Sequence, residues 1–259
     1  MLLKDRVAII TGSGKGIGKV AALKLAQEGA TVVNVSRTQA EIDRTAEEIR
    51  ALGGKALAVS ADISKPEQVE AMIERTVGEL GQIDILINNA AMPGPVKQLV
   101  DLDFEDWDFV YGINVRGTMA CCKYALRHMI PRRGGSIINI SSTVARKGAA
   151  GRTHYSSSKT AVVGFTRALA MEAGPHNIRV NCIVPGAVMT ELLHNLITRE
   201  SKEQGITYEE RKAVYAGPSP MGRITEPEEV ADAMIYLASD LSQGITGQSV
   251  DVNSGAWMS

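Results

Sequence analysis

The sequence predicts an α/β protein whose single domain contains a doubly wound, seven-stranded parallel sheet with helices on both faces. Two observations predict this class. Short apolar runs rich in β-branched residues alternate along the chain with segments whose apolar residues recur at helical spacing, which is typical of a parallel sheet covered on both sides. The first apolar run also leads directly into a cluster of glycines that precedes the first helical segment.

The expected strands are short apolar runs, and the expected helices fill the intervals between them. The strands are expected at residues 7–10, 31–35, 56–59, 83–87, 136–140, 179–184 and 248–252. The helices are expected at residues 17–28, 39–52, 66–79, 105–130, 155–173 and 227–239. Because helical crossovers join parallel strands, the carboxyl ends of all these strands should lie along one edge of the sheet.

Residues 187–225 interrupt the regular alternation. The segment is charged, partly helical in pattern, and contains the turn sequence GPSP at residues 217–220. A long insertion between a strand and the next helix is either a lid over a site or a plain surface excursion. No linker, repeat or low-complexity tract divides the chain, so residues 1–259 are expected to form one domain.

The composition is ordinary for a globular protein and excludes several function classes. Of the 259 residues, 44% are hydrophobic, 22% charged and 4% aromatic, and the formal net charge is -1. This balance gives no reason to expect a nucleic acid or an anionic membrane as a partner. The four histidines lack metal-ligand spacing, so no metal site is expected.

Cysteine usage and hydropathy bear on the compartment. Three cysteines do not make a disulfide framework, so we expect buried thiols in a reducing compartment. No apolar stretch approaches the ~18 residues that span a bilayer. The charges at Lys4, Asp5 and Arg6 argue against a signal peptide. A cytoplasmic location is therefore expected.

Chemically distinctive motifs follow five of the expected strands. They are residues 12–18 after the first strand, Asp62 after the third, 88–90 after the fourth, Ser142 after the fifth and 185–190 after the sixth. Ligands of open α/β sheets bind outside the carboxyl ends of the strands. The sequence therefore predicts that these motifs gather at one site on that edge.

The first motif is a glycine-rich turn that reads TGSGKGIG at residues 11–18. Its spacing is G-x-x-x-G-x-G from Gly12, rather than G-x-G-x-x-G, and no Gly-Lys-Ser/Thr of a Walker-type loop follows. Glycines let backbone N–H groups approach a pyrophosphate, and the N-terminus of the next helix adds unpaired N–H groups and a positive dipole end. A glycine-rich turn that binds nothing is the alternative.

Tyr155 and Lys159 are four residues apart, and Ser142 lies thirteen residues before Tyr155. On a helix, this spacing puts the phenol and the ammonium on the same face. A nearby cation favours the phenolate, so we expect Lys159 to lower the pKa of Tyr155 from its usual ~10. Such a tyrosine can give a proton to a carbonyl oxygen or take one from an alcohol. A solvated helix face is the alternative.

Together with the sequence NNA at residues 88–90, these motifs resemble the short-chain dehydrogenase/reductase family over nearly the whole chain. The resemblance implies a Rossmann fold with strand order 3-2-1-4-5-6-7 and a homotetramer. The chain departs from the family pattern at Ala91, where glycine is usual, and at residues 253–255, which read NSG instead of NGG.

The resemblance also implies roles for individual residues. Tyr155 would be the general acid or base, and Ser142 would donate a hydrogen bond to the substrate oxygen, with Ser141 or a simple capping role as alternatives. Asn114 would kink the long helix and hold a water that leads to Lys159; a buried amide bonded to the backbone is the alternative. The implied cofactor-binding set is Gly12, Ser13, Gly14, Lys15, Gly16, Ile17, Gly18, Ser36, Arg37, Asp62, Ile63, Asn89, Ala90, Tyr155, Lys159, Pro185, Gly186, Val188 and Thr190.

The residues after the second expected strand favour NADP(H) over NAD(H). A cofactor without a 2′-phosphate is usually held there by a carboxylate, and none occupies this position; the first acidic residue is Glu41, inside the next helix. Arg37 and Lys15 supply two cations that suit a phosphate, and Ser36 can donate a hydrogen bond. NAD(H), with both cations merely solvated, is the alternative.

The sequence therefore predicts an NADP(H)-dependent oxidoreductase acting on a carbonyl or secondary alcohol. An NAD-linked polyol or sugar-derivative dehydrogenase and a nucleotide sensor without turnover remain alternatives. No feature names the small-molecule substrate. Small residues on the helix at 155–173 could pack against a second copy, or inside the domain; they are Ala161, Gly164, Ala168 and Ala170.

Overall fold

The computed structural model describes residues 1–258 and contains one parallel sheet with the strand order β3-β2-β1-β4-β5-β6-β7. The strands are β1 (Val7–Thr11), β2 (Thr31–Ser36), β3 (Lys55–Ser60), β4 (Ile85–Asn88), β5 (Gly135–Ile140), β6 (Ile178–Pro185) and β7 (Ser249–Val252). The predicted fold class and strand order are confirmed. The strand order reverses between β1 and β4, which places a ligand-binding switch point at their carboxyl ends.

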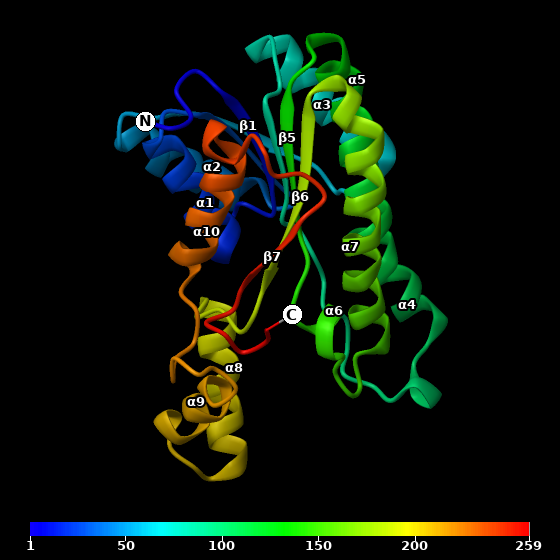
Figure 1. Cartoon of the computed structure of the whole chain (residues 1–259). Helices are drawn as coiled ribbons and strands as arrows, with labels where there is room; N and C mark the ends of the chain where they lie inside the picture. The colour runs from blue at the N-terminus through cyan, green and yellow to red at the C-terminus, as the bar shows by residue number, and fades with distance from the viewer. Residues whose placement is uncertain (259) are drawn as a thin grey trace.

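Helices cover both faces of the sheet (Figure 1). One face carries α1 (Gly16–Gln27), α2 (Gln39–Ala51) and α10 (Pro227–Ala238). The other carries α3 (Pro66–Leu80), α4 (Phe104–Tyr111), α5 (Thr118–Arg132) and α7 (Thr153–Ala173). Short elements complete the chain: α6 (Val144–Lys147) and the 3-10 turns η1 (Leu99–Asp101), η3 (Gly174–His176) and η4 (Asp240–Ser242).

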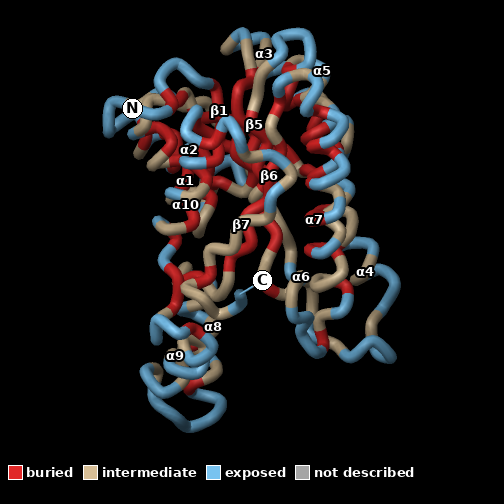
Figure 2. The backbone as a smooth tube through the Cα atoms, viewed as in Figure 1, coloured by how far each residue is buried: buried red, intermediate tan, exposed pale blue. Residues whose placement is uncertain are grey.

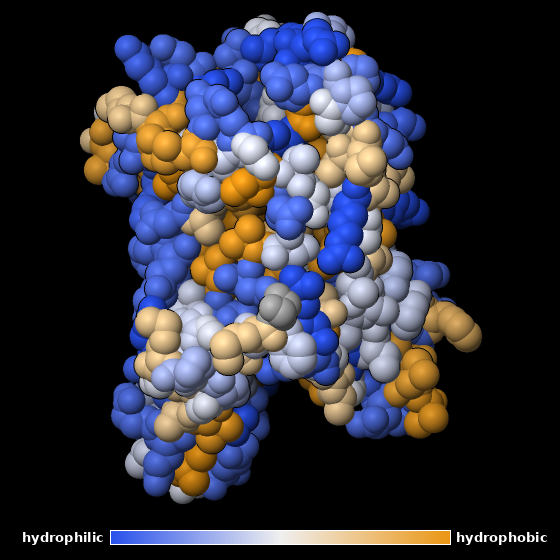
Figure 3. All heavy atoms as spheres, viewed as in Figure 1, coloured by the Kyte–Doolittle hydropathy of each residue, from blue (hydrophilic) through white to orange (hydrophobic). Residues whose placement is uncertain are grey.

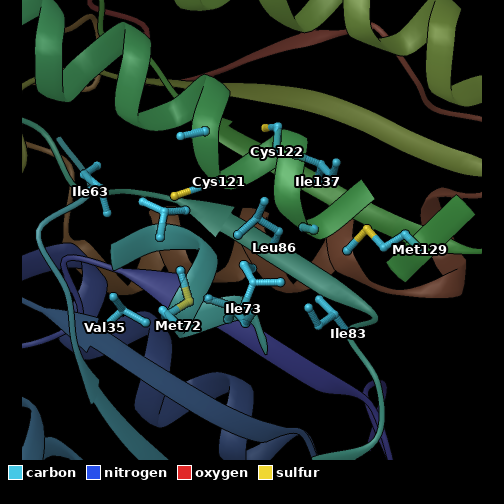
Figure 4. Packing of buried hydrophobic residues seen from close by; sticks show 14 of the residues in the cluster. Val35, Ile63, Met72, Ile73, Ile83, Leu86, Cys121, Cys122, Met129 and Ile137 are labelled. Carbon is cyan, nitrogen blue, oxygen red and sulfur yellow. The ribbon is translucent and has the colours of Figure 1, made fainter. Parts of the chain in front are cut away.

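The core consists of two apolar layers, one on each face of the sheet. Alternation along each strand divides the side chains, so that Ile9 of β1 faces one layer while Ala8 and Ile10 face the other. Buried positions lie along the strands and on the inner sides of the helices (Figure 2). Leu86 and Ile137 from adjacent strands pack among the side chains of α3 and α5 (Figure 4). All three cysteines are buried and free, as predicted.

The single helix predicted at residues 105–130 is interrupted. A π-helical segment, η2 (Gly112–Gly117), separates α4 from α5. A π turn holds one more residue than an α turn, and here it contains Asn114, which is 1% exposed. The Asn114 side chain accepts a hydrogen bond from the Met92 N–H at 2.8 Å and donates one to the Ser158 hydroxyl at 3.0 Å. The interruption thus coincides with a buried amide that ties three segments together.

Residues 187–225 form a helical hairpin of α8 (Glu191–Gln204) and α9 (Tyr208–Ala216). The pair projects beyond the carboxyl edge of the sheet (Figure 1). A carboxylate on α8 joins the two helices, because Glu200 accepts hydrogen bonds from Arg211 at 2.7 Å and Tyr215 at 2.9 Å. Closure of this hairpin over a site stays a prediction. No helix within residues 1–258 combines the length and apolar character that a membrane span requires.

Candidate active site

The glycine-rich turn connects β1 to α1 at the switch point. Gly12 and Gly16 have φ angles of 68° and 57°, in the region that favours glycine. A methyl group at Gly18 would collide with the carbonyl oxygen of Gly12. The sequence therefore needs glycine at these positions to bring the helix N-terminus close to the end of the strand.

The end of β4 holds this turn in place. The Asn89 side chain donates hydrogen bonds to the carbonyl oxygens of Thr11 at 2.9 Å and Gly12 at 3.2 Å. In return, the Thr11 hydroxyl accepts hydrogen bonds from the backbone N–H groups of Asn89 at 3.1 Å and Ala90 at 3.0 Å. The two loops at the switch point are thus mutually bonded before any ligand arrives.

A cavity of about 380 Å³ opens beside this turn. It lies between the carboxyl ends of β1, β2, β3 and β4, and it contains many of the residues that the sequence assigned to a dinucleotide. Its lining consists of Gly12, Gly14, Lys15, Val35, Ser36, Arg37, Thr38, Glu41, Ala61, Asp62, Ile63, Asn89, Ala90, Ala91, Met92 and Ile113.

The cavity fits the adenosine half of a dinucleotide. Exposed backbone of Gly12 and Gly14 borders it, and the N-terminus of α1 follows directly, as a pyrophosphate requires. Ile63, which is 6% exposed, gives one apolar wall suited to a base. The Arg37 guanidinium has no hydrogen-bond or ion-pair partner among residues 1–258 and is available to an anion.

The other members of the predicted set lie outside this cavity. The Ser13 hydroxyl is buried and accepts a hydrogen bond from the Val35 N–H at 2.9 Å, so it supports the turn from behind. Thr190 is the N-cap of α8. A methyl group built on Gly16 would lie 3.7 Å from the Thr190 side chain, so the two residues face each other. Val188 is 7% exposed and pairs with Thr225 in an isolated bridge. The remaining members, outside the cavity lining, are Gly16, Ile17, Gly18, Tyr155, Lys159, Pro185 and Gly186.

Sequence reasoning missed one charged residue of the cavity. The sequence places Glu41 inside the helix after the second strand and not among the expected cofactor-binding residues, yet it lines the cavity with Lys15 and Arg37. The signal was the helix start: α2 begins at Gln39, so Glu41 is in its first turn, at the end next to the sheet edge. Its carboxylate lies 3.7 Å from the Lys15 ammonium.

Ser142, Tyr155 and Lys159 converge at the carboxyl end of β5. Tyr155 and Lys159 lie one turn apart on α7, and the Lys159 ammonium is 5.8 Å from the centre of the Tyr155 ring. Ser142 follows β5 and interacts with the Tyr155 hydroxyl through its side chain. The neighbouring Ser141 hydroxyl is buried and donates to the Lys159 carbonyl oxygen at 2.8 Å, so it is already engaged.

The predicted effect of Lys159 on Tyr155 is wrong for this structure. Loss of water around the phenol raises the pKa of Tyr155, although the residue as a whole is only partly buried. The hydrogen bond with Ser142 and the positive charge of Arg152 lower the pKa of Tyr155, but they do not outweigh desolvation. Desolvation disfavours the charged phenolate, and it is the largest of these effects on the pKa of Tyr155.

Lys159 is itself shifted by burial. Its side chain is 3% exposed, and its ammonium donates a hydrogen bond to the Ile140 carbonyl oxygen at 2.8 Å. Desolvation lowers the pKa of Lys159 to about 8. The nearby Cys182 gives no countercharge at neutral pH, because burial raises the pKa of that thiol to about 11.

A buried chain of hydrogen bonds fixes α7 against the sheet. Asn88 on β4 donates to Asn139 on β5 at 2.8 Å, and Asn139 donates to the Thr166 hydroxyl on α7 at 2.9 Å. The Ser141 bond to Lys159 and the Lys159 bond to Ile140 add two more ties between β5 and the same helix. The tyrosine-bearing helix is therefore held by polar contacts along its length as well as by packing.

The loop after β4 closes the other side of the Tyr155 region. Arg152 donates hydrogen bonds to the carbonyl oxygens of Pro93 at 3.3 Å and Gly94 at 3.4 Å. His154 is completely buried against Gly94. The surface is notched between the projecting α8–α9 pair and the lobe that contains α4 (Figure 3). Residues 1–258 contain no group of three or more His, Cys, Asp or Glu side chains that could hold a metal ion.

Comparisons with known proteins match nearly the whole length of this chain. Residues 12–256 match the family model described as enoyl-(acyl carrier protein) reductase. The chain is 38% identical over 257 residues to the (2S)-[(R)-hydroxy(phenyl)methyl]succinyl-CoA dehydrogenase subunit BbsD of Thauera aromatica, with 98% of each chain covered. It is 35% identical over 255 residues to the 3-oxoacyl-[acyl-carrier-protein] reductase FabG of Thermotoga maritima, covering 98% of this chain and 99% of that one.

A solved structure agrees with these sequence matches. The crystal structure of a short-chain type dehydrogenase/reductase from Mycobacterium marinum aligns with a TM-score of 0.89 and 35% identity. The alignment covers 99% of this chain and 97% of that chain.

Proposed function

Because this chain belongs to the short-chain dehydrogenase/reductase family, we propose that it transfers a hydride between NADP(H) and a carbonyl or secondary-alcohol substrate. The family consists of oxidoreductases that bind a nicotinamide dinucleotide. The observation that carries the proposal is the convergence of Ser142, Tyr155 and Lys159 on the same carboxyl edge of the sheet as the cavity suited to the adenosine half of a dinucleotide. The relatives include a 3-oxoacyl-[acyl-carrier-protein] reductase and a dehydrogenase named for a hydroxy compound, which fits this pair of functional groups.

The proposed dinucleotide site uses the whole carboxyl edge of the sheet. Backbone groups of Gly12 and Gly14 with the N-terminus of α1 hold the pyrophosphate. Arg37 and Lys15 hold the 2′-phosphate, which favours NADP(H). Asp62, Ile63, Asn89 and Ala90 would hold the adenine and its ribose. Tyr155 and Lys159 would hold the nicotinamide ribose. Val188 and Thr190, which follow Pro185 and Gly186, would hold the carboxamide. When bound, the dinucleotide supplies or accepts the hydride.

Tyr155 moves the proton that must accompany this hydride. In reduction, the Tyr155 hydroxyl donates its proton to the carbonyl oxygen as negative charge develops there, and Ser142 donates a hydrogen bond to the same oxygen. In oxidation, the Tyr155 oxygen takes the proton of the alcohol. The raised pKa keeps the phenol protonated in the free protein, which is the form that reduction needs.

Lys159 and Asn114 support this proton transfer by positioning the groups that carry it out. Lys159 places a buried positive charge one turn from Tyr155 and holds the end of β5 through Ile140. Asn114 is bonded to Met92 in the loop after β4 and to Ser158 in the second turn of α7, one residue before Lys159. We assign both to positioning of the reacting groups.

Replacing Tyr155 with phenylalanine tests the assignment. Tyr155→Phe removes the transferable proton and keeps the ring, so dinucleotide affinity should persist while turnover falls by about 10²–10⁴-fold. Fluorescence titration with NADPH measures the dinucleotide affinity. Absorbance of the reduced nicotinamide, with a panel of ketones and secondary alcohols, measures the turnover. Tyr236→Phe, at an exposed tyrosine on α10, is the matched control.

Two results would contradict the proposal. Substantial turnover by Tyr155→Phe would remove Tyr155 from its role. Tight dinucleotide binding without turnover of any panel member by the unaltered protein would favour a nucleotide sensor instead.

The preference for NADP(H) has its own test. Arg37→Asp replaces a cation that would face the 2′-phosphate with a carboxylate that would face ribose hydroxyls. The variant should reverse the ratio of kcat/KM for NADPH and NADH. An unchanged ratio would show that Arg37 does not contact this part of the cofactor.

We also propose that the protein assembles as a homotetramer. On α7, Gly164 and Ala168 are exposed, whereas Ala170 packs inside the core and Ala161 is partly buried. Met171 on the same helix is 81% exposed. An apolar, small-residue face of this kind suits close helix packing between copies. A monomeric mass by light scattering would refute the assembly.

A further inference from the structure

We infer that Glu41 weakens the discrimination of this protein against NAD(H), so that the site takes both dinucleotides. The inference rests on the proposed function and adds a specificity-determining residue to it. The cavity for the adenosine half contains two acidic residues, Asp62 and Glu41, beside its two cations. The Asp62 carboxylate accepts hydrogen bonds from Ser64, whereas the Glu41 carboxylate is positioned to oppose a 2′-phosphate.

The position of Glu41 supports this role. Its side chain lines the same cavity as Arg37, Ser36 and Lys15. One carboxylate oxygen is 3.7 Å from the Lys15 ammonium. A methyl group built on Gly14 would lie 2.8 Å from the other carboxylate oxygen, so the carboxylate borders the glycine turn directly. The Glu41 side chain is 35% exposed and the Lys15 side chain is 78% exposed, so the carboxylate is the more buried member of the pair.

The backbone of Glu41 is tied to the glycine turn. The Thr45 hydroxyl is buried and bonds both to the Glu41 carbonyl oxygen at 3.1 Å and to the Ser13 carbonyl oxygen at 3.2 Å. The Glu41 N–H also bonds to the Thr38 carbonyl oxygen at 3.1 Å. The first turn of α2 therefore cannot withdraw from the cavity without breaking contacts that shape the turn itself.

The charge balance then decides the consequence. A phosphate monoester carries about -1.5 to -2 charges at pH 7. Glu41 repels such a group and also occupies Lys15, which leaves Arg37 as the unpaired cation of the cavity lining in residues 1–258. A ribose without the phosphate meets no such repulsion, and its hydroxyls can donate to a carboxylate. Preference for the phosphorylated cofactor is thus smaller than two cations alone would give.

Binding of nucleotide fragments to the intact protein tests the inference without relying on catalysis. Titration calorimetry would compare 2′,5′-ADP with 5′-AMP for the unaltered protein and for Glu41→Gln. The variant should bind 2′,5′-ADP about fivefold more tightly or better, since two charges ~4 Å apart in water interact by about 1 kcal/mol. The affinity for 5′-AMP should rise less than the affinity for 2′,5′-ADP, so the ratio of the two affinities should shift toward 2′,5′-ADP.

Glu47→Gln is the matched control. Glu47 is an exposed residue on the same helix, and its loss changes the net charge equally. It should leave the ratio of the two affinities within about twofold, because exposed charges beyond a Debye length of roughly 8–10 Å are screened. Steady-state kcat/KM values for NADPH and NADH should follow the fragment affinities in each variant.

The outcomes separate this inference from the proposed function. An unchanged affinity of Glu41→Gln for 2′,5′-ADP, or an equal effect of Glu47→Gln, would overturn the inference and leave the dinucleotide site standing. Failure of the unaltered protein to bind either fragment, NADPH or NADH would overturn the proposed function instead.

Discussion

Replacing Lys159 with methionine should make the free protein more stable while it abolishes efficient turnover. Lys159 is 3% exposed, and the folded protein lowers the pKa of Lys159 from 10.5 to about 8. Keeping this group protonated in the folded state at pH 7 therefore costs about 3 kcal/mol relative to the unfolded chain. Methionine fills a similar apolar volume and carries no charge.

The net gain is smaller than this cost, because the substitution also removes a hydrogen bond. The Lys159 bond to the Ile140 carbonyl oxygen contributes about 1 kcal/mol. We expect Lys159→Met to raise the free energy of unfolding by about 2 kcal/mol at pH 7.

The difference should depend on pH with a definite sign. Between pH 8 and pH 10.5 the unfolded chain keeps the Lys159 proton that the folded protein has lost. Folding of the unaltered protein therefore becomes more favourable as the pH rises through this window. The advantage of the variant should be complete below pH 8 and should disappear toward pH 10.5.

Urea unfolding without dinucleotide, at equal protein concentrations and at several pH values from 6 to about 10, measures this difference. Lys202→Met, at an exposed lysine of α8, is the control and should show no such pH-dependent gain. A Lys159→Met variant that is less stable than the unaltered protein at pH 7 would refute the reasoning. So would a stability difference that stays constant between pH 8 and 10.

Further expectations concern the polar ties, the glycine turn and the acid group. Asn139→Ala deletes buried bonds to Asn88 and Thr166 and should lower the free energy of unfolding by about 2–4 kcal/mol in urea titrations; a loss below about 0.5 kcal/mol would contradict this. Gly18→Ala should weaken NADPH binding by about tenfold or more in fluorescence titrations, because the added methyl group collides with the Gly12 carbonyl oxygen. Gly78→Ala is the control, because its methyl group meets no atom within 4 Å, and it should leave NADPH binding unchanged. For carbonyl reduction, kcat/KM should not fall between about pH 6 and pH 7, because Tyr155 and Lys159 both keep their protons in this range; a loss of activity centred within this range would disprove this.

The strands were predictable because β-branched apolar runs indicate a buried sheet, but their ends were not. Residues 83–87 were expected as a strand, and β4 is Ile85–Asn88. Ile83 is fully buried without pairing in the sheet, and the Asp84 carboxylate accepts hydrogen bonds from the Val7 N–H at 2.7 Å and Gln82 at 2.8 Å. Hydropathy reports burial, and it does not report which backbone groups pair.

The break at Asn114 and the presence of Glu41 in the cavity show a second limit. Helical periodicity continues across residues 105–130, because a π turn shifts the apolar pattern by only one residue. Glu41 lies only two residues after the start of α2, so its direction depends on where the helix starts. Helix boundaries predicted from sequence are uncertain by a few residues. This uncertainty is enough to decide whether a side chain in the first turn of a helix faces the site.

The pKa values show a third limit, because spacing gives proximity but not solvation. Burial raises the pKa of Tyr155 above 10 and lowers that of Lys159 to about 8. On titration with base, the free protein therefore loses the Lys159 charge before the phenol ionises. The charge that should favour a phenolate is gone when a phenolate would form. In the free protein the phenol of Tyr155 therefore keeps its proton, which is the form that the proposed carbonyl reduction requires.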